Sequence, residues 1–205
     1  MTPERSAAIR YASATVICIV TLAVLVRTGA TQTVDAGLVE RAAGFTSGRP
    51  GLLRGLELFE EVTRPVWLYA VVTPLILLTG WRARVWRRAA AAWVSLMVLW
   101  SSAALLKIVV GRPRPAAALV EASGLSFPSG HATNIAAVTV GLALLLWPLV
   151  GSRERRLLVA VGVVLTVAVV LDRVFLGVHY PSDVLAGVLY GGGFVAAASR
   201  LWPRR

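Results

Sequence analysis

The sequence is poor in charged residues and has a single cysteine. Charged side chains make up 15% of the 205 residues and hydrophobic ones 57%, whereas soluble domains have about 25% charged and about 45–50% apolar residues. With a mean hydropathy of +0.74, this composition excludes an ordinary soluble domain and indicates an integral membrane protein. The only cysteine, Cys18, excludes an intramolecular disulfide. We expect one domain over residues 1–205, since this length leaves room for roughly five or six membrane spans.

Six apolar runs predict an all-α, integral membrane bundle of six transmembrane helices. Several runs are shorter than the ~20 residues that a span needs. Neighbouring residues such as Trp81, Phe175 and Trp202 extend them to the membrane interfaces. The runs are Ile9–Val26, Pro65–Thr79, Ala89–Leu106, Ala132–Val150, Leu157–Leu171 and Val184–Leu201.

The placement of arginine predicts the orientation of the bundle. Twelve of the 21 Lys and Arg residues fall on the side of the two termini, whereas eight of the ten acids fall on the other side. Because Lys and Arg are enriched in cytoplasmic loops, we expect both termini in the cytoplasm. The twelve cations are Arg5, Arg10, Arg82, Arg84, Arg87, Arg88, Arg153, Arg155, Arg156, Arg200, Arg204 and Arg205.

Two alternatives bear on this layout. The net charge of +11 is found on a nucleic-acid-binding face in some soluble proteins, but here the arginines form short clusters between apolar runs, so no nucleic-acid partner is expected. The first apolar run is also compatible with a signal peptide cleaved near Ala30. Arg27 and the length of the run favour an uncleaved first span.

Two further segments have a helical pattern. Residues 51–62 place Leu52, Leu56 and Phe59 on one face, which predicts an amphipathic helix that lies in the membrane interface or caps the bundle. It is assigned no catalytic role. Small residues on the last span, Gly187, Gly191, Gly192 and Gly193, predict close helix packing.

Three polar clusters lie on the predicted outer side of the membrane. The first holds Lys107, Arg112 and Arg114, the second Ser129, Gly130 and His131, and the third Asp172, Arg173, His179 and Asp183. Each has an ordinary explanation when taken alone: cations anchoring a helix end, a serine N-cap, and a local ion pair. Ionisable residues at this depth are costly, and three clusters at helix ends on one side favour a shared site.

A phosphate group suits these side chains. Lys107, Arg114 and Arg173 can neutralise its charge, and Ser129 with the Gly130 N–H at a helix N-terminus adds donors.

The two histidines suit phosphoryl transfer. His179, oriented by Asp183, can attack phosphorus, and His131 can protonate the leaving oxygen. The carboxylates Glu121, Asp172 and Asp183 are too few and too spread for a two-metal site, so neither a metal nor another cofactor is expected.

These residues resemble the three-part signature of the type 2 phosphatidic acid phosphatase superfamily, which also includes vanadium haloperoxidases and glucose-6-phosphatase. The resemblance covers about Ala89 to Leu201 closely, with the signature in residues 107–183. It implies a phosphohistidine on His179, an acid in His131, and phosphate binding by Lys107, Arg114, Ser129, Gly130 and Arg173. One position departs, because the family usually has Ser where this chain has Asp172, which can hold Arg173 or weaken its grip on phosphate. The matching parts are Lys107-x6-Arg114-Pro115, Pro128-Ser129-Gly130-His131 and Arg173-x5-His179-x3-Asp183.

The predicted function is therefore an integral membrane lipid phosphatase in the inner membrane of a bacterium, with its site on the extracytoplasmic face. By resemblance, the candidate substrates are polyprenyl pyrophosphate, phosphatidylglycerol phosphate, phosphatidic acid and diacylglycerol pyrophosphate, with a slight preference for the first. The alternative is a non-catalytic lipid-phosphate binding or transport protein, against which the two histidines argue, since binding alone needs no nucleophile. Haloperoxidase chemistry is disfavoured because those relatives are soluble. The sequence leaves the lipid and the oligomeric state open.

Overall fold

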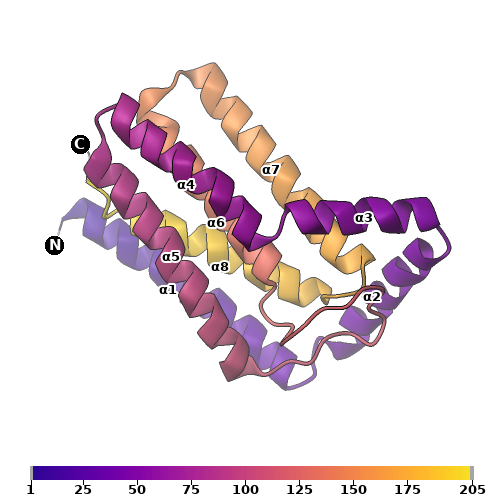
Figure 1. Ribbon diagram of the computed structural model, residues 1–205. Coiled ribbons are helices and arrows are strands. Elements are labelled where there is room, and N and C mark those ends of the chain that lie inside the picture. Colours follow the sequence, from indigo (N-terminus) through magenta and orange to yellow (C-terminus); the bar gives the residue numbers. More distant parts are fainter. Residues whose placement is uncertain (1, 204–205) are drawn as a thin grey trace.

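The computed structural model describes residues 2–203, and all regular elements in that range are helical (Figure 1). This confirms the all-α prediction. Met1 and the last two residues lie outside the described range, so Arg204 and Arg205 of the charge comparison are not placed. The elements are α1 (Pro3–Arg27), α2 (Gln32–Ser47), α3 (Pro50–Val62), α4 (Pro65–Arg82), α5 (Trp86–Val110), α6 (Gly130–Leu146), the 3-10 turn η1 (Trp147–Leu149), α7 (Ser152–Phe175) and α8 (Pro181–Ser199).

The number of membrane spans is five or six. Five helices, α1, α5, α6 with η1, α7 and α8, are each long and apolar enough to cross a membrane. A sixth span is possible where α3 and α4 pass the same test together, although they are bent by 47° at the break between them. Long helices are expected here, because every backbone N–H and C=O inside lipid must be paired within the chain. The described residues thus contain five candidate spans, and the sixth stays a prediction.

The helix ends follow local sequence signals. Proline occupies the first turn of α1, α3, α4 and α8, where its missing N–H leaves no bond unmade. Helix α5 ends at Gly111, whose φ of +67° is the left-handed cap conformation that glycine adopts without strain. This cap turns the chain out of the bundle at Arg112, two residues before Arg114 of the signature.

Helices α4, α5, α6 and α8 share the main apolar core. Its buried members include Tyr69, Leu96, Leu99, Ala137 and Val195. Helix α8 lies against both α6 and α1. The central position of α6 and α8 matters for the site, because His131 lies in the first turn of α6 and Asp183 in the first turn of α8.

The glycines of α8 allow this close packing, as predicted. A Cβ on Gly191 would overlap the carbonyl oxygen of Thr133 on α6, and one on Gly187 would lie 2.8 Å from the carbonyl oxygen of Ser129. A Cβ on Gly193 would collide with Thr15 of α1. The backbone of α8 therefore touches that of α6 at Gly187 and Gly191, one helical turn apart, which only a residue without a side chain permits.

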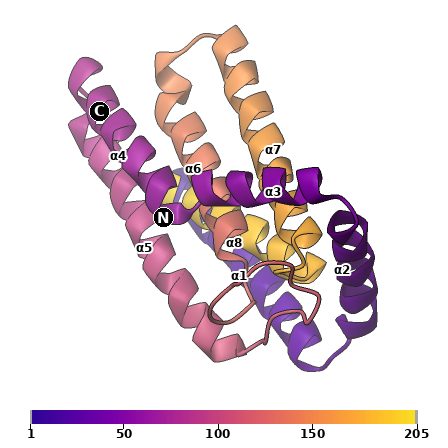
Figure 2. The same ribbon diagram turned by 45° about the vertical axis from the view of Figure 1, so that its right-hand side comes forward.

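Both ends of the described chain lie at the end of the bundle where α4 joins α5 and α6 joins α7 (Figure 1). The opposite end carries α2, α3, the irregular segment 111–129 and the turn between α7 and α8 (Figures 1 and 2). This arrangement matches the predicted loop order, and the side that faces the cytoplasm stays a prediction. Helix α2 has no counterpart among the predicted elements. Helix α3 packs on α7 and α2, which favours the capping alternative for residues 51–62.

Candidate active site

The segment 111–129 brings the first polar cluster over the ends of α6 and α8. Lys107 fixes its far end, because Nζ donates to the carbonyl oxygens of Leu125 and Pro128 at 2.8 Å each. The Arg112 carbonyl accepts from the Ser126 N–H at 2.8 Å and closes the segment on itself. Lys107 thus holds the chain just before Ser129 through main-chain carbonyls.

His179 lies at the turn between α7 and α8 with its two ring nitrogens in different surroundings. Nδ1 is 3.6 Å from Asp183 Oδ2 and 3.3 Å from Ser126 Oγ. Nε2 lies 3.2 Å from Nη1 of Arg114, which also donates to the Val178 carbonyl at 2.9 Å. The ring is therefore held from the Nδ1 side, and Nε2 points to the arginine that the sequence predicted as a phosphate ligand.

The environment keeps His179 neutral. Burial lowers its pKa to about 4, and the positive charges of Arg114 and Lys107 act in the same direction, against the opposing effect of Asp183. At pH 7 the imidazole is thus unprotonated and has a lone pair available. This is the state that a nucleophile needs.

Asp183 is held in place by three donors besides the histidine contact. Its Oδ2 accepts the Tyr180 N–H at 3.0 Å, as part of the capping interaction at the start of α8, and also the Ser126 hydroxyl. Its Oδ1 accepts from Arg112 at 2.7 Å. Ser126 was missed from the sequence, since it lies outside the quoted signature parts and only the fold brings it between Asp183 and His179.

His131 and Ser129 stand at the N-terminus of α6 with unused polar atoms. Among the described residues, His131 Nε2 and Ser129 Oγ are buried without a hydrogen-bond partner. Buried polar atoms in proteins are almost always paired. Two such atoms at a helix N-terminus, next to the free N–H groups of the first turn, form a place where an anion would find donors.

Arg173 is held between two carboxylates. Its Nε donates to Asp172 Oδ2 at 2.8 Å, and Nη2 contacts the same oxygen. Its Nη1 pairs with Glu60 Oε1 of α3 at 2.9 Å. Of the two roles considered for Asp172, the structure shows the first, a salt bridge that holds Arg173. Glu60 was missed because the amphipathic pattern of residues 51–62 gave no sign that one of its acids points into a site.

The predicted residues gather around one cavity of about 440 Å³. This volume is within the range of about 300–1,000 Å³ usual for small-molecule sites. Arg114, His131, Arg173 and His179 line it, so all three parts of the signature meet there. Lys107, Ser129, Gly130 and Asp183 stand behind the lining rather than in it. Glu60, Arg64, Trp100 and Glu121 complete the polar and aromatic part of the wall.

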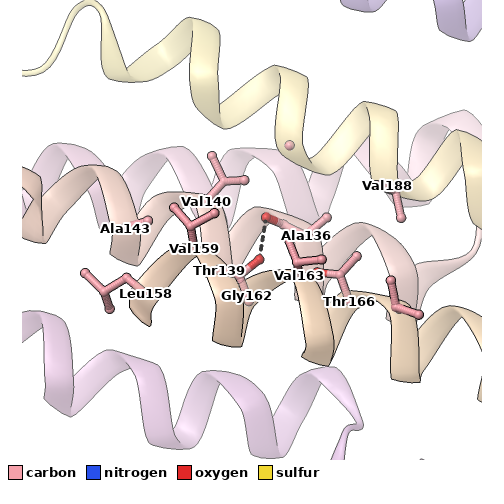
Figure 3. A pocket seen from close by; sticks show the side chains of 12 residues that line it. Ala136, Thr139, Val140, Ala143, Leu158, Val159, Gly162, Val163, Thr166 and Val188 are labelled. Carbon is pink, nitrogen blue, oxygen red and sulfur yellow. Dashed lines mark hydrogen bonds between the residues drawn. The ribbon is translucent and has the colours of Figure 1, made fainter. Parts of the chain in front are cut away.

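A second cavity, of about 380 Å³, lies between α6, α7 and α8 (Figure 3). Its only polar side chains are Thr139 and Thr166, and the Thr139 hydroxyl donates within its own helix to the Ile135 and Ala136 carbonyls. Such a lining offers no nucleophile and no charge. Within residues 2–203, no group of three His, Cys, Asp or Glu side chains is placed to hold a metal ion. The cavity lined by His131 and His179 is therefore the candidate active site.

A helical bundle of membrane-span length, with two histidines and three arginines around one cavity, is the arrangement expected of an integral membrane phosphatase that acts on an anionic group. Residues 88–205 match the profile of the PAP2 superfamily. The chain belongs to that superfamily, as the signature predicted, and it is a phosphatase.

Similar proteins agree with this assignment. The chain is 32% identical over 179 residues to phosphatidylglycerophosphatase B of Bacillus subtilis, covering 83% of this chain and 84% of the relative. It is 38% identical over 151 residues to decaprenylphosphoryl-5-phosphoribose phosphatase of Mycobacterium tuberculosis, covering 70% and 76%. The crystal structure of a transmembrane PAP2-type phosphatidylglycerolphosphate phosphatase from Bacillus subtilis superposes with a TM-score of 0.79 at 25% identity, covering 89% and 91%. The chain is thus a multi-pass membrane protein similar to bacterial lipid phosphatases.

Proposed function

We propose that this protein hydrolyses the terminal phosphate or pyrophosphate of a membrane lipid through a phosphohistidine on His179. The observation that carries the proposal is the position of His179, with Nε2 at the cavity beside Arg114 and Nδ1 toward Ser126 and Asp183. His131 lines the same cavity with a free Nε2. A nucleophile and a proton donor thus face one space, and an orienting carboxylate stands behind the nucleophile.

In the first step, Nε2 of His179 attacks phosphorus and the bond to the lipid oxygen breaks, while His131 gives that oxygen a proton. The ring of His179 becomes positive, and Asp183 stabilises it from the Nδ1 side. In the second step, water attacks the phosphohistidine, His131 takes the water's proton, and the N–P bond breaks to release inorganic phosphate. Proton transfer by a positioned histidine contributes typically about 10²–10⁴-fold.

Positive charge binds the phosphoryl group in this scheme. Arg114 and Arg173 face the cavity and match phosphate oxygens with their planar guanidinium groups. Ser129 Oγ and the Gly130 N–H approach from the start of α6, and Lys107 adds charge behind them. We expect no metal to take part, because arginines and helix donors supply the charge stabilisation that a metal would otherwise give.

The substrate class follows from the surroundings of the site. The residues that line the cavity include members of segment 111–129, of the turn between α7 and α8 and of the start of α6. These parts of the chain lie at one end of the bundle (Figure 1), so a lipid chain can stay in the bilayer while its head group enters. Phosphatidylglycerol phosphate and polyprenyl pyrophosphate are the first candidates, since two relatives are named as a phosphatidylglycerophosphatase and as a putative undecaprenyl-diphosphatase. Phosphatidic acid and diacylglycerol pyrophosphate have the same terminal group and belong to the same panel.

The test is phosphate release by the purified, detergent-solubilised protein in EDTA from this panel of lipids. We expect release by the unmodified chain and none above background by His179→Ala, with thermal melting confirming that the variant is folded. With an aryl phosphate, whose leaving group needs no proton, His131→Ala should regain the first step, seen as a burst of aryl alcohol followed by slow turnover, and His179→Ala should show no burst. Lipid binding without release by the unmodified chain would favour the transport alternative and reject the phosphatase mechanism.

The predicted extracytoplasmic position of the site has its own test. In a Cys18→Ala background, Glu121→Cys would place one thiol beside the cavity, and Arg153→Cys would place one at the other end of the bundle. A membrane-impermeant maleimide added to intact cells should label the first and not the second. The reverse pattern would place the site in the cytoplasm.

A further inference from the structure

A buried network of charged side chains lies behind the catalytic carboxylate. Arg112 Nη1 donates to Asp183 Oδ1 and to Ser182 Oγ, each at 2.7 Å. Its Nη2 donates to Asp35 Oδ2 of α2, also at 2.7 Å. Asp35 Oδ1 in turn accepts the Ser182 N–H at 3.0 Å. The network thus runs from Asp35 of α2, through Arg112, to Asp183, whose carboxylate faces His179.

All members of this network are removed from solvent. The relative exposure is 3% for Asp35, 6% for Arg112 and 0% for Asp183. Arg112 also lies over the ring of Tyr180, with its guanidinium carbon 3.9 Å from the ring centroid, so the plane of the fork is fixed. A buried ion pair of this kind is weak evidence for stability, because the desolvation of the charges offsets their attraction. A role in holding Asp183 is the better explanation.

The two oxygens of Asp183 have separate tasks in this arrangement. Oδ2 faces the Nδ1 side of His179, whereas Oδ1 is bound by Arg112. Arg112 fixes the rotation of the Asp183 carboxylate. Its positive charge, however, partly cancels the negative charge with which Asp183 stabilises a protonated or phosphorylated His179. Asp35 compensates that charge from the far side of the guanidinium.

We propose that Asp35 is a positioning residue, which through Arg112 keeps Asp183 oriented and fully effective as an anion toward His179. The inference rests on the proposed function, since it assigns a part in the same site. Asp35 lies outside residues 88–205, the part that matches the superfamily profile. The N-terminal part of the chain therefore completes the active site instead of serving only as a membrane anchor.

The sign of the electrostatic effect can be derived from the groups around His179. Asp183 faces it from α8, Arg114 from the segment 111–129, and Lys107 from α5. His131 of α6 and Arg173 of α7 face it across the cavity. None of these groups changes its charge when Asp35 becomes Asn. The only difference is that Asp35 no longer compensates the positive charge of Arg112.

That charge disfavours an imidazolium, so the pKa of His179 should fall in Asp35→Asn. In Arg112→Gln the positive charge is gone and both carboxylates remain, so the pKa of His179 should rise. Opposite shifts from two partners of one salt bridge are a signature that mere loosening of the structure would not give.

The first measurement is NMR titration of the protein with ¹³C-labelled histidine in detergent micelles. The chain has two histidines, and His131→Gln assigns the signal of His179. We expect a lower midpoint in Asp35→Asn, a higher one in Arg112→Gln, and no change in the control Glu40→Gln, which removes an exposed carboxylate from the same helix. Equal midpoints in all variants, or shifts of the same sign in the two network variants, would overturn the proposal.

The second measurement is steady-state lipid phosphate release. Partners that orient a ligating or catalytic group are worth roughly 10–100-fold in activity, so kcat should fall by about that factor in Asp35→Asn, with KM within about twofold. A kcat within about twofold of the unmodified chain would contradict a positioning role.

The two measurements separate the failure of this inference from failure of the proposed function. The titration needs no substrate, so an unmodified chain without phosphatase activity would reject the proposed function and leave the network's effect on His179 measurable. If Asp35→Asn does not fold, the upward shift in Arg112→Gln alone decides: its presence supports the network, and its absence refutes it.

Discussion

Glu60 should compete with the substrate's phosphate for Arg173. Its carboxylate is 2.9 Å from Nη1, the guanidinium nitrogen that Asp172 does not contact, and both residues line the cavity. A phosphate that binds Arg173 must therefore displace Glu60 or lie beside its negative charge. Replacing Glu60 by Gln should tighten the binding of inorganic phosphate.

The size of the effect follows from the burial of the pair. The side chains are 1% exposed for Arg173 and 16% exposed for Glu60, so screening by solvent is limited. A hydrogen bond between charged groups is worth about 1.5–3 kcal/mol and is roughly twice as strong as a neutral one. Gln keeps the shape and an acceptor oxygen, so the change removes about 1 kcal/mol of competition, which is roughly fivefold in affinity.

The assay is competitive inhibition of lipid hydrolysis by inorganic phosphate at pH 7. Ionic strength is held at about 0.15 M, because salt screens charges near the cavity mouth. We expect the inhibition constant to fall about fivefold in Glu60→Gln and to stay unchanged in Glu57→Gln, which removes an exposed acid from the same helix. An unchanged or higher constant in Glu60→Gln would show that Arg173 does not bind the phosphate through Nη1.

Three further predictions concern pH, packing and orientation. Because burial lowers the pKa of His179 to about 4, the acid limb of kcat/KM should appear near pH 4; a limb near 6.5 would mean that a different group is titrating. The same shift should lower stability as pH falls from about 6.5 toward 4, where the unfolded chain takes up the proton first, and thermal melting over that range checks the sign. Gly191→Ala drives a methyl group into a main-chain carbonyl of α6 and should destabilise the protein by about 1–3 kcal/mol, whereas Gly192→Ala, whose Cβ would meet its nearest neighbour at 3.7 Å, should melt like the unmodified chain. Ser126→Ala removes the hydroxyl that bonds Asp183 and should lower kcat about tenfold with KM unchanged; a larger effect on KM would contradict an orienting role.

The sequence alone determined the class of fold and four charged or histidine side chains that line the cavity. Long apolar runs predict helices because backbone groups in lipid must be paired internally. Each of the six runs falls on a helix of the structure, namely α1, α4, α5, α6, α7 and α8. Charged residues at helix ends are costly in a membrane, so Arg114, His131, Arg173 and His179 were recognisable without coordinates. Spacing along the chain also placed Asp183 beside His179, since four residues separate them at the start of a helix.

Only the tertiary structure decided what surrounds these groups. Glu60 reaches Arg173, and Asp35 reaches Arg112 and Ser182, across contacts between residues far apart in the sequence. No local periodicity encodes such a pairing, because each acid is an ordinary polar residue within its own helix. Helix α2, which carries Asp35, is too polar to be found as a membrane span and was not predicted at all. Local sequence specifies the histidines and arginines that line the cavity, whereas the packing of α2 and α3 against the ends of α7 and α8 sets the charges that those groups experience.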